Sequence, residues 1–399
     1  MKQFFQTQFT KLLLKQGYSD HYAKFISKSF INDIYQKDLP LKSKLWAKKR
    51  GFFSKKLDYF KLTDENYTNY ISDFDYYRLH PINGLFSHWI DDKLIIRLIL
   101  CPFEEYLPEY YFHVVDEEVL LLPDCPKHLS NTIEDIFKLL IQVKDLAAKP
   151  YIGSRGLGFC KLSYKGSKFY LNDHQSSRNE LEKHFQDWKA MKLGGYLITE
   201  YLKPIKELSD IWTETANTVR ISIIRKKHLM PEIIGAYIRF GTEKSGVVDN
   251  SCSGGVGCRI DLSTGSFSGG VKFLDGQIVN IKFHPDTHVP LQGVIPHWSE
   301  IKEKIIEISN FIPQVIYFGY DISVTESGFK ILEINSHEGI AFNQFYSPYL
   351  SNENTKDFFL PLLVDKKKEL EAMKNHRFLR RFVFLLRKIK HKISQALRS

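Results

Sequence analysis

The sequence has 399 residues, of which 43% are hydrophobic and 14% are aromatic. This composition excludes a disordered chain, and the length is enough for two or three packed domains. No uncharged apolar run approaches the roughly 18 residues that a membrane-spanning helix needs. The first 15 residues are interrupted by polar side chains and are not followed by a small-residue cleavage site, so they do not resemble a signal peptide.

The net charge of +10 is concentrated at the C-terminus. Nine basic residues and no acidic residue lie between Lys374 and Ser399, so residues 1–373 carry a net charge of only +1. A nearly neutral body is not typical of a nucleic-acid-binding protein. The five cysteines have neither an even number nor CxxC spacing, and Cys252 and Cys258 have no histidine or cysteine pair beside them as further metal ligands. We interpret all five as reduced thiols, which predicts a cytoplasmic protein.

The first 85 residues are basic and aromatic and are predicted to be helical. After Ile95, short apolar runs separated by turn signals predict strands interleaved with a few helices, as in an α+β or α/β core. The predicted strands are Phe159–Tyr164, Phe169–Asn172, Tyr196–Leu202, Thr218–Arg225, Ile233–Phe240, Val256–Leu262, Val315–Val324 and Phe329–Asn335. The predicted helices are Asn131–Val143, Asn179–Met191, Ile205–Thr213 and Ser299–Phe311.

A lysine precedes a glycine-rich stretch in the middle of the chain. Lys149 is followed by Gly153, Ser154, Gly156 and Gly158. Glycines allow backbone N–H groups to face a phosphate without interference from a Cβ, and the lysine can add a point charge. The glycine order differs from the dinucleotide fingerprint and from the P-loop. The stretch therefore indicates either a phosphate-binding loop or an ordinary turn with a solvated lysine.

Arg220 lies in a run in which polar and apolar residues alternate from Thr218 to Ile223. The alternation places Arg220 on the polar face of a strand, together with Thr218 and Ser222. A strand holds an arginine rigidly, so its planar fork could meet a phosphoryl group. A surface arginine in an ordinary ion pair is the alternative.

Two strand-like runs near the C-terminal end of the core carry three oxygen ligands. If a three-residue turn, Glu326–Gly328, joins them, Asp321 lies opposite Glu333, and Asn335 shares the face of Glu333. Burying two unpaired carboxylates side by side would cost on the order of 3–5 kcal/mol. Two carboxylates and an amide leave coordination positions for water and phosphate oxygens, which suits Mg²⁺. The alternative is a pair of exposed acids on an edge hairpin.

Taken together and in this order, the segments resemble the ATP-grasp superfamily. The group they resemble most is the sugar-transfer-associated ATP-grasp, or alpha-L-glutamate ligase-related, proteins, which occur with surface-polysaccharide biosynthesis. The resemblance covers roughly residues 86–350. It is most specific in the metal hairpin and in Asn217–Arg220, which matches the "NTxR" element. The fold that it implies is α+β, with two α+β subdomains that clasp ATP.

The resemblance implies roles for individual residues. Arg220, near the γ-phosphate, and Asn250 would be catalytic, and His337 is either a substrate contact or part of a different turn. Residues implied to contact the nucleotide are Lys93, Lys149, Gly153, Ser154, Gly156, Gly158, Glu200, Tyr201 and Leu202. Residues implied to bind the metal are Asp321, Glu333 and Asn335. Residues implied to lie near the acceptor substrate are Asp249, Asn250, Gly254, Gly255, His337 and Gly339.

The activity implied is that of a ligase that uses ATP and Mg²⁺, with Mn²⁺ as an alternative, to join a carboxylate and an amine through an acyl phosphate. We expect a sugar acid or an amino acid, free or lipid-linked, as substrate. An ATP-grasp phosphotransferase and a non-catalytic ATP-binding scaffold are the alternatives. The predicted organisation is a helical region (1–85), a first subdomain with the glycine loop (86–203), a second with the metal site (204–365) and a basic tail (366–399).

The tail is predicted to form an amphipathic helix. On a helical wheel, Phe378, Phe382 and Ile389 lie on one side, and Arg380 and Lys388 lie largely opposite. A basic amphipathic helix is typical of a protein that lies on an anionic membrane, here the inner face of the cell membrane. A helix packed on the body or on a partner, and a nucleic-acid-binding tail, are the alternatives.

Overall fold

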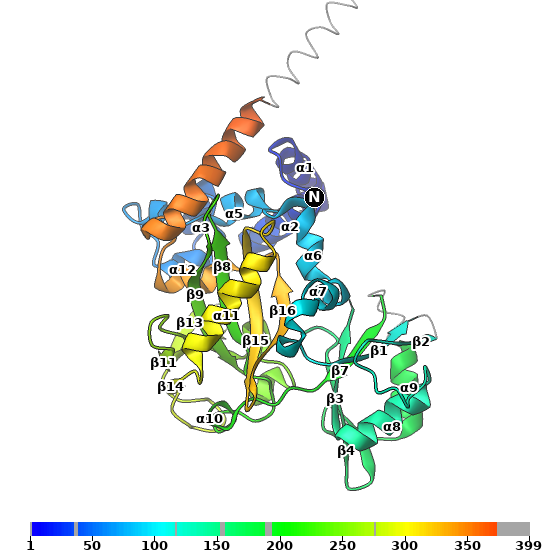
Figure 1. The fold of residues 1–399 in the computed structure, drawn as a ribbon. Helices are drawn as coiled ribbons and strands as arrows, with labels where there is room; N and C mark the ends of the chain where they lie inside the picture. The colour runs from blue at the N-terminus through cyan, green and yellow to red at the C-terminus, as the bar shows by residue number, and fades with distance from the viewer. Residues whose placement is uncertain are drawn as a thin grey trace, which may run out of the picture. The chain divides into compact units, whose positions relative to one another are not determined.

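The computed structural model describes residues 2–35, 39–115, 118–151, 156–187, 194–274 and 277–372, coloured along the chain in Figure 1. The chain divides into two compact units, Met1–His80 with Gln344–Ser399, and Pro81–Asn343. We call the first the helical unit and the second the two-sheet unit. No helix in the described ranges is long and apolar enough to cross a membrane.

The helical unit consists of short helices joined by tight turns. Helix α1 packs on α2 through the rings of Phe9 and Phe30, whose centroids are 4.6 Å apart, and through a hydrogen bond between Thr10 and Ser27 (2.6 Å). The helical structure predicted for this region is therefore present. Its helices are α1 (Lys2–Lys15), α2 (Asp20–Tyr35), α3 (Leu41–Lys49), α4 (Lys56–Phe60), the 3-10 turn η1 (Tyr67–Asn69), α5 (Asp73–Leu79) and a helix over residues 353–372.

The first sheet of the two-sheet unit has the strand order β2-β1-β7-β3-β4-β5-β6, and all its neighbouring strands are antiparallel. Helices α8 and α9 cover one side of it (Figure 1), because their apolar side chains, such as Phe137 and Leu181, join the sheet's buried core. The elements are β1 (Tyr110–Val115), β2 (Glu118–Leu121), α8 (Ile133–Val143), β3 (Asp145–Pro150), β4 (Cys160–Lys165), β5 (Lys168–Leu171), β6 (His174–Ser176), α9 (Arg178–Asp187) and β7 (Tyr196–Glu200).

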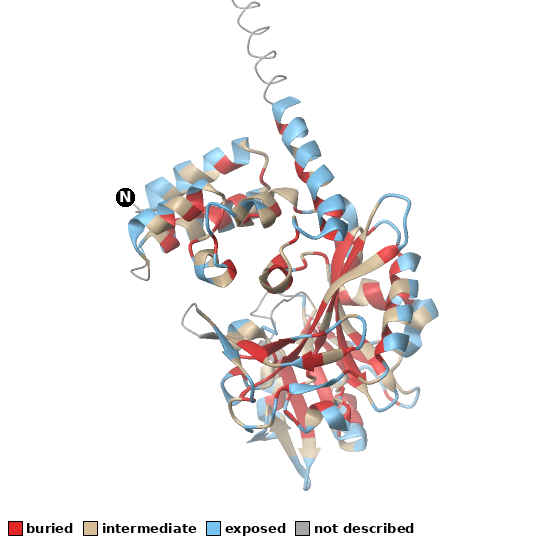
Figure 2. Ribbon diagram, turned by 90° about the vertical axis from the view of Figure 1, so that its left-hand side faces the viewer, coloured by how far each residue is buried: buried red, intermediate tan, exposed pale blue. Residues whose placement is uncertain are grey.

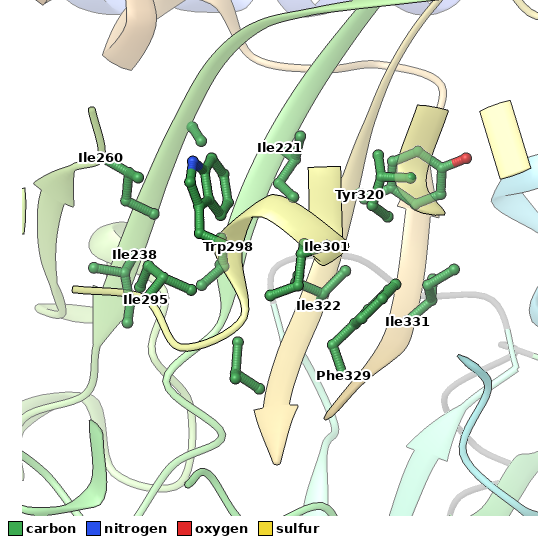
Figure 3. Close-up of a cluster of buried hydrophobic side chains, with 14 of the residues drawn as sticks. Ile221, Ile238, Ile260, Ile295, Trp298, Ile301, Tyr320, Ile322, Phe329 and Ile331 are labelled. Atoms are coloured by element: carbon green, nitrogen blue, oxygen red, sulfur yellow. The ribbon is translucent and has the colours of Figure 1, made fainter. Parts of the chain in front are cut away.

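The second sheet has the order β13-β12-β10-β9-β8-β15-β16, again with antiparallel neighbours. Figure 3 shows Trp298 and Ile301 of α11 packed among strand residues such as Ile238 and Ile322, so the core lies between this helix and the sheet. The strands are β8 (Val219–Arg225), β9 (Pro231–Phe240), β10 (Val256–Arg259), β12 (Gly270–Leu274), β13 (Gln277–Ile281), β15 (Tyr317–Thr325) and β16 (Gly328–Asn335), with β11 (Ser266–Ser268) and β14 (Gln292–Val294) as a separate pair.

The remaining elements are short connections, with one long helix. In Figure 2 the buried residues are concentrated in the strands and the exposed residues along the outer sides of the helices. These elements are η2 (Gly84–Phe86), α6 (Ser87–Asp91), α7 (Lys93–Ile99), η3 (Cys101–Tyr106), α10 (Lys206–Ser209), η5 (Glu243–Ser245), η6 (Ser251–Ser253), α11 (Trp298–Phe311) and α12 (Ile340–Tyr346).

Most predicted elements are present within a few residues, and two are shorter for local reasons. The helix predicted over Ile205–Thr213 ends early, at Ser209, and the Asn217 side chain donates hydrogen bonds to the carbonyl oxygens of Leu208 (3.1 Å) and Trp212 (2.6 Å). The strand predicted over Val256–Leu262 ends at Arg259. Just beyond it, the Asp261 carboxylate accepts hydrogen bonds from the next residues and forms a turn.

The β15–β16 hairpin corrects one prediction and confirms another. The predicted pairing of Thr325 with Phe329 is wrong, because Thr325 pairs with Gly328 across a two-residue turn. A β-bulge at Leu332 then inserts one extra residue into β16, and Asp321 is opposite Glu333 as predicted. Because a bulge sets two residues against one, Leu332 and Glu333 both reach the same cleft.

Candidate active site

A cleft in the two-sheet unit is lined by residues from both sheets and from α7. Its volume is about 960 Å³, including space open to solvent. The apolar lining includes Ala147, Pro150, Leu157, Phe159, Leu202, Val247, Val248 and Leu332. The polar and charged lining includes Lys93, Lys149, Glu200, Thr218, Arg239, Asp249, Asn250, Asp321 and Glu333.

Two lysines reach the cleft from different elements. Lys93 is the first residue of α7, and Lys149 is on β3. The Asp92 carboxylate caps α7 and also accepts a hydrogen bond from the Tyr151 hydroxyl. It therefore links the start of α7, where Lys93 lies, to the segment just after Lys149. The Lys149 ammonium lies 5.3 Å from the centre of the Tyr110 ring. Burial and then the positive charge of Lys93 lower the pKa of Lys149 to about 7, so this pair favours an anion beside it.

The three predicted metal ligands converge at the end of the β15–β16 hairpin. Asp321 is directly opposite Glu333, and the Asn335 amide donates a hydrogen bond to Glu333 (3.3 Å). Burial and then the charge of Asp321 raise the pKa of Glu333. Burial would also raise the pKa of Asp321, but Arg220 and Arg239 outweigh it and hold this pKa well below its usual range. The pair thus has one firmly ionised carboxylate and one that favours a proton or a cation.

The buried carboxylate of Glu338, together with that of Asp321, binds the Arg220 guanidinium. The Arg220 guanidinium donates hydrogen bonds to both carboxylate oxygens of Asp321 and one to Glu338. The other oxygen of Glu338 accepts a hydrogen bond from Ser222 (2.7 Å). A Cβ on Gly319 would lie 2.2 Å from the Glu338 carboxylate, so glycine makes room for it. Arg220 is not among the residues that line the cleft.

Among the described residues, the arginine that lines the cleft is Arg239, on β9. It donates hydrogen bonds to Asp321 (3.1 Å) and Asn250 (3.3 Å), and its Nε lies 3.3 Å from Asp249. Asp249 also accepts a hydrogen bond from the backbone N–H of Thr218 (2.7 Å). The segments around Thr218 and Asp249 are therefore joined through one carboxylate, which orients Arg239 toward Asp321.

This arrangement agrees with a family match. Residues 75–356 match the family model of sugar-transfer-associated ATP-grasp proteins. The chain belongs to this family. This match confirms the predicted family, the ATP-grasp fold and the prediction of an ATP-grasp enzyme. No curated protein sequence matches the chain.

Several solved structures share the fold at low identity. A D-alanine–D-alanine ligase from Bacillus anthracis is 14% identical, with a TM-score of 0.38, over 72% of this chain and 71% of that one. D-alanyl-alanine synthetase A from Vibrio cholerae is 11% identical, with a TM-score of 0.40, over 70% and 65%. A biotin carboxylase from Campylobacter jejuni is 11% identical, with a TM-score of 0.38, over 69% and 46%. These values carry no inference about the substrate.

Many of the site residues predicted for this ATP-grasp protein line the cleft. Among the predicted nucleotide contacts these are Lys93, Lys149, Gly156, Glu200, Tyr201 and Leu202. Among the predicted metal, catalytic and substrate residues they are Asp321, Glu333, Asp249 and Asn250. Gly153 and Ser154 lie outside the described residues.

Other predicted residues are not part of the cleft lining. These are Gly158, Arg220, Gly254, Gly255, Asn335, His337 and Gly339. Gly255 has a packing reason instead, because a Cβ there would lie 2.3 Å from the backbone oxygen of Asp249. Gly254 has a φ of +114°, in the left-handed region that favours glycine. Their roles near the acceptor remain predictions.

Two charged residues of the site, Arg239 and Glu338, have no counterpart in the sequence predictions. Arg239 could have been noticed as a charged residue inside the predicted strand Ile233–Phe240, where apolar residues precede and follow it. Glu338 gives no local signal, because it lies in the turn after β16 and its buried partners, Arg220 and Ser222, are more than 100 residues earlier in the chain.

The donor set of the cleft fits a nucleotide with a divalent cation. In the described part of the chain, no group of three or more His, Cys, Asp or Glu could hold a metal ion. The candidate cation site therefore consists of two carboxylates and an amide, Asp321, Glu333 and Asn335, which is an oxygen-donor set that Mg²⁺ accepts. A cation there would remove the repulsion that raises the Glu333 pKa, and phosphate oxygens would meet Lys93 and Lys149.

Proposed function

We propose that this protein is an ATP- and Mg²⁺-dependent carboxylate–amine ligase, with Mn²⁺ as an alternative cation. The observation that carries the proposal is that the Asp321–Glu333 pair lies in one cleft with Lys93, Lys149 and Arg239. Phosphoryl transfer needs charge neutralisation and positioning more than covalent catalysis, and this set of charges supplies both.

The nucleotide is held by residues from both sheets. Leu202 and Leu332 would supply apolar surface for the adenine, and Glu200 would contact the ribose. Lys93 and Lys149 hold the α- and β-phosphates. Asp321, Glu333 and Asn335 would hold a Mg²⁺ ion, which would supply positive charge beside the phosphates.

The reaction has two steps. A carboxylate oxygen of the first substrate attacks the γ-phosphorus of ATP, the bond to the β-bridging oxygen breaks, and an acyl phosphate and ADP form. The amine nitrogen of the second substrate then attacks the acyl carbon, phosphate leaves with the bonding electron pair, and the nitrogen loses a proton to form the amide. The apolar walls exclude water, which protects the acyl phosphate from hydrolysis.

We assign different roles to the two arginines. Arg239 faces the cleft beside Asp321, so its guanidinium stabilises the negative charge on the transferring phosphoryl group. It thereby takes the role expected from the sequence for Arg220. Arg220 is held by Asp321 and Glu338 and acts as a positioning residue that orients the Asp321 carboxylate.

The family supports the substrate class that we propose. Its description connects the ATP-grasp domain with sugar transfer, which supports a sugar acid or an amino acid in surface-polysaccharide or capsule biosynthesis, free or lipid-linked. The acceptor is an amine. Asp249 and Asn250 border the cleft beside Arg239, so we assign the acceptor subsite to this side.

The test combines product analysis with one variant. The protein is incubated with ATP, Mg²⁺ and a panel of uronic acids, amino acids and amines, and ADP release and product mass are measured. An amide product supports the ligase, a stable phosphorylated product indicates a phosphotransferase, and ATP binding without turnover on any substrate indicates a scaffold. Glu333→Gln should lower turnover on the order of 100-fold. The matched control is Glu326→Gln, in the exposed turn of the same hairpin, which should leave turnover unchanged.

We also propose the domain division and the cellular location. The two ATP-grasp subdomains would extend over residues 86–203 and 204–365, flanked by the helical region 1–85 and the basic tail 366–399. Residues 373–399, which hold the predicted amphipathic helix, lie outside the described residues. We propose a cytoplasmic protein whose tail attaches to the inner face of the cell membrane. Equal vesicle binding by the full chain and by a variant with the tail's basic residues replaced would contradict this attachment.

A further inference from the structure

The first three helices present apolar side chains to solvent. Of 23 large hydrophobic residues that are exposed among the described residues, eight lie between residues 4 and 45. In α1, Phe4 is 63% exposed and Phe5 is 52% exposed. In α3, Leu41 and Leu45 are more than half exposed. These exposed side chains lie on three helices that follow one another in the chain, and apolar side chains that gather on a surface mark an interaction site.

The charges on the same helices are almost all of one sign. The exposed acidic side chain among the described residues of α1, α2 and α3 is Asp20, and Lys24 pairs with it. Asp33 is buried. The exposed basic residues are Lys11, Lys15, Lys24, Lys28, Lys42 and Lys49.

Helical spacing places apolar and basic residues side by side. Leu13 of α1 is buried in the core of the helical unit. Phe4, Lys11 and Lys15 follow the opposite face at intervals of seven and four residues, and Phe5 and Leu12 lie on the adjacent line. Figure 2 shows the exposed residues along the outer side of the helix that begins at the N-terminus.

We propose that the outward faces of α1, α2 and α3, the α1–α3 surface, bind an anionic phospholipid membrane. Aromatic and leucine side chains enter the interfacial region of a bilayer, while lysines meet the headgroup phosphates. A nucleic acid would satisfy the lysines but leave Phe4, Phe5 and Leu41 without apolar partners. The chain's own tail carries nine basic residues and no acidic one, so charge repulsion disfavours it as the occupant.

The proposal does not depend on the ligase activity. It gives the protein a second membrane contact, besides the one proposed for the tail. The α1–α3 surface would orient the protein toward substrates at the membrane, beyond simple attachment. Its failure would leave the proposed chemistry untouched, because none of its residues lines the cleft.

Vesicle flotation of the full-length protein tests the charge component. Phosphatidylcholine vesicles with and without phosphatidylglycerol are the probes. Lys11→Glu/Lys15→Glu/Lys28→Glu should reduce the fraction bound to anionic vesicles several-fold. The matched control is Lys165→Glu/Lys168→Glu/Lys227→Glu, which reverses three exposed lysines of the two-sheet unit and should bind like the parent protein. Unchanged thermal unfolding shows that the folded structure is retained, and equal flotation of both triple variants overturns the proposal.

Tryptophan substitutions test the apolar component separately from the tail. Phe4→Trp should be quenched by brominated acyl chains in anionic vesicles, beyond the quenching of the five native tryptophans in the parent protein. Leu229→Trp, at an exposed position of the two-sheet unit, should show no added quenching. Quenching at neither position, with flotation intact, would assign membrane binding to the tail alone. Binding of the parent protein to an acidic polypeptide but not to vesicles would indicate a protein partner. Either result overturns the proposal.

Discussion

Two clusters of buried charge show how differently one protein uses ionised groups. In the helical unit, the Asp33 carboxylate accepts hydrogen bonds from the Lys48 ammonium and from the backbone N–H (3.2 Å) and hydroxyl (2.8 Å) of Ser54. Lys44 donates a hydrogen bond to the backbone oxygen of Asp33 (2.7 Å). The Asp33 carboxylate therefore has its hydrogen-bond donors and an opposite charge, Lys48, within the protein.

The cluster in the cleft brings like charges together. Lys93 lies near Lys149, and Asp321 lies opposite Glu333. Burial and then these like charges lower the pKa of Lys149 and raise the pKa of Glu333, and a phosphate and a cation would oppose these shifts. The comparison teaches that burial alone does not mark a functional site. A site is marked by charges that the protein leaves for a ligand to balance.

The largest expected effect is on stability, in the Asp33 cluster. Asp33→Asn leaves the Lys48 ammonium buried without its carboxylate and should lower the free energy of unfolding of the helical unit by about 3–5 kcal/mol. Denaturant unfolding followed by circular dichroism measures it. The matched control is Asp20→Asn, which breaks the exposed pair with Lys24 and should change stability by less than about 1 kcal/mol. Equal effects of the two substitutions would contradict the distinction between the clusters.

The second prediction separates the two arginines. Arg239→Lys should lower kcat on the order of 10–100-fold, because lysine keeps the charge but loses the planar fork at the cleft. Arg220→Lys should instead raise the Mg²⁺ concentration needed for half-maximal rate and lower the melting temperature, because it loosens Asp321 and leaves Glu338 with a poorer partner. Identical kinetic profiles for the two variants would argue against separate roles.

The third prediction concerns the sign of a stability change. Glu333→Gln removes a like charge directly opposite Asp321 and should stabilise the free protein by about 0.2–1 kcal/mol, although it impairs turnover. The matched comparison is Glu338→Gln, which weakens a satisfied pair with Arg220 and should destabilise. Thermal unfolding without nucleotide or metal measures both. A loss of stability in Glu333→Gln would mean that the two carboxylates do not repel each other.

The smallest expected effect is the uptake of a fraction of a proton by Lys149 when ADP binds at pH 8. With a pKa of about 7, Lys149 is mostly neutral at pH 8, and nearby phosphates would favour its charged form. ADP binding at pH 8 without Mg²⁺ should therefore take up a proton, and binding at pH 6 should take up almost none because Lys149 is already protonated. Calorimetry in buffers of different ionisation enthalpy measures the uptake. Lys149→Met should abolish it, and uptake that persists in this variant would assign it to another group.

The same shift predicts how the stability of the free protein depends on pH. Lys149 has a pKa of about 7 in the folded protein and an ordinary value of 10.5, so the unfolded chain binds more protons between these values. Its contribution therefore raises stability as the pH increases from about 7 toward 10.5. Melting temperatures of the parent protein and Lys149→Met across this range should converge at the alkaline end.

Local patterns in the sequence were enough to predict the α+β core and most strand positions. Strand alternation also predicted that Arg220 shares a face with Ser222, and both contact Glu338. The reason is that alternation and spacing act over a few residues, where the backbone geometry is fixed.

Tertiary structure decided which of these residues line the cleft. Arg220 and Arg239 each look like a lone arginine in a strand. The long-range contact with Glu338 takes Arg220 out of the cleft, and Asp249 and Asn250 orient Arg239 into it. The bulge at Leu332, which compensates for the shorter turn, is equally invisible in a periodic pattern. Hydrogen bonds between segments that are far apart in the chain set these features, so no local signal could have predicted them.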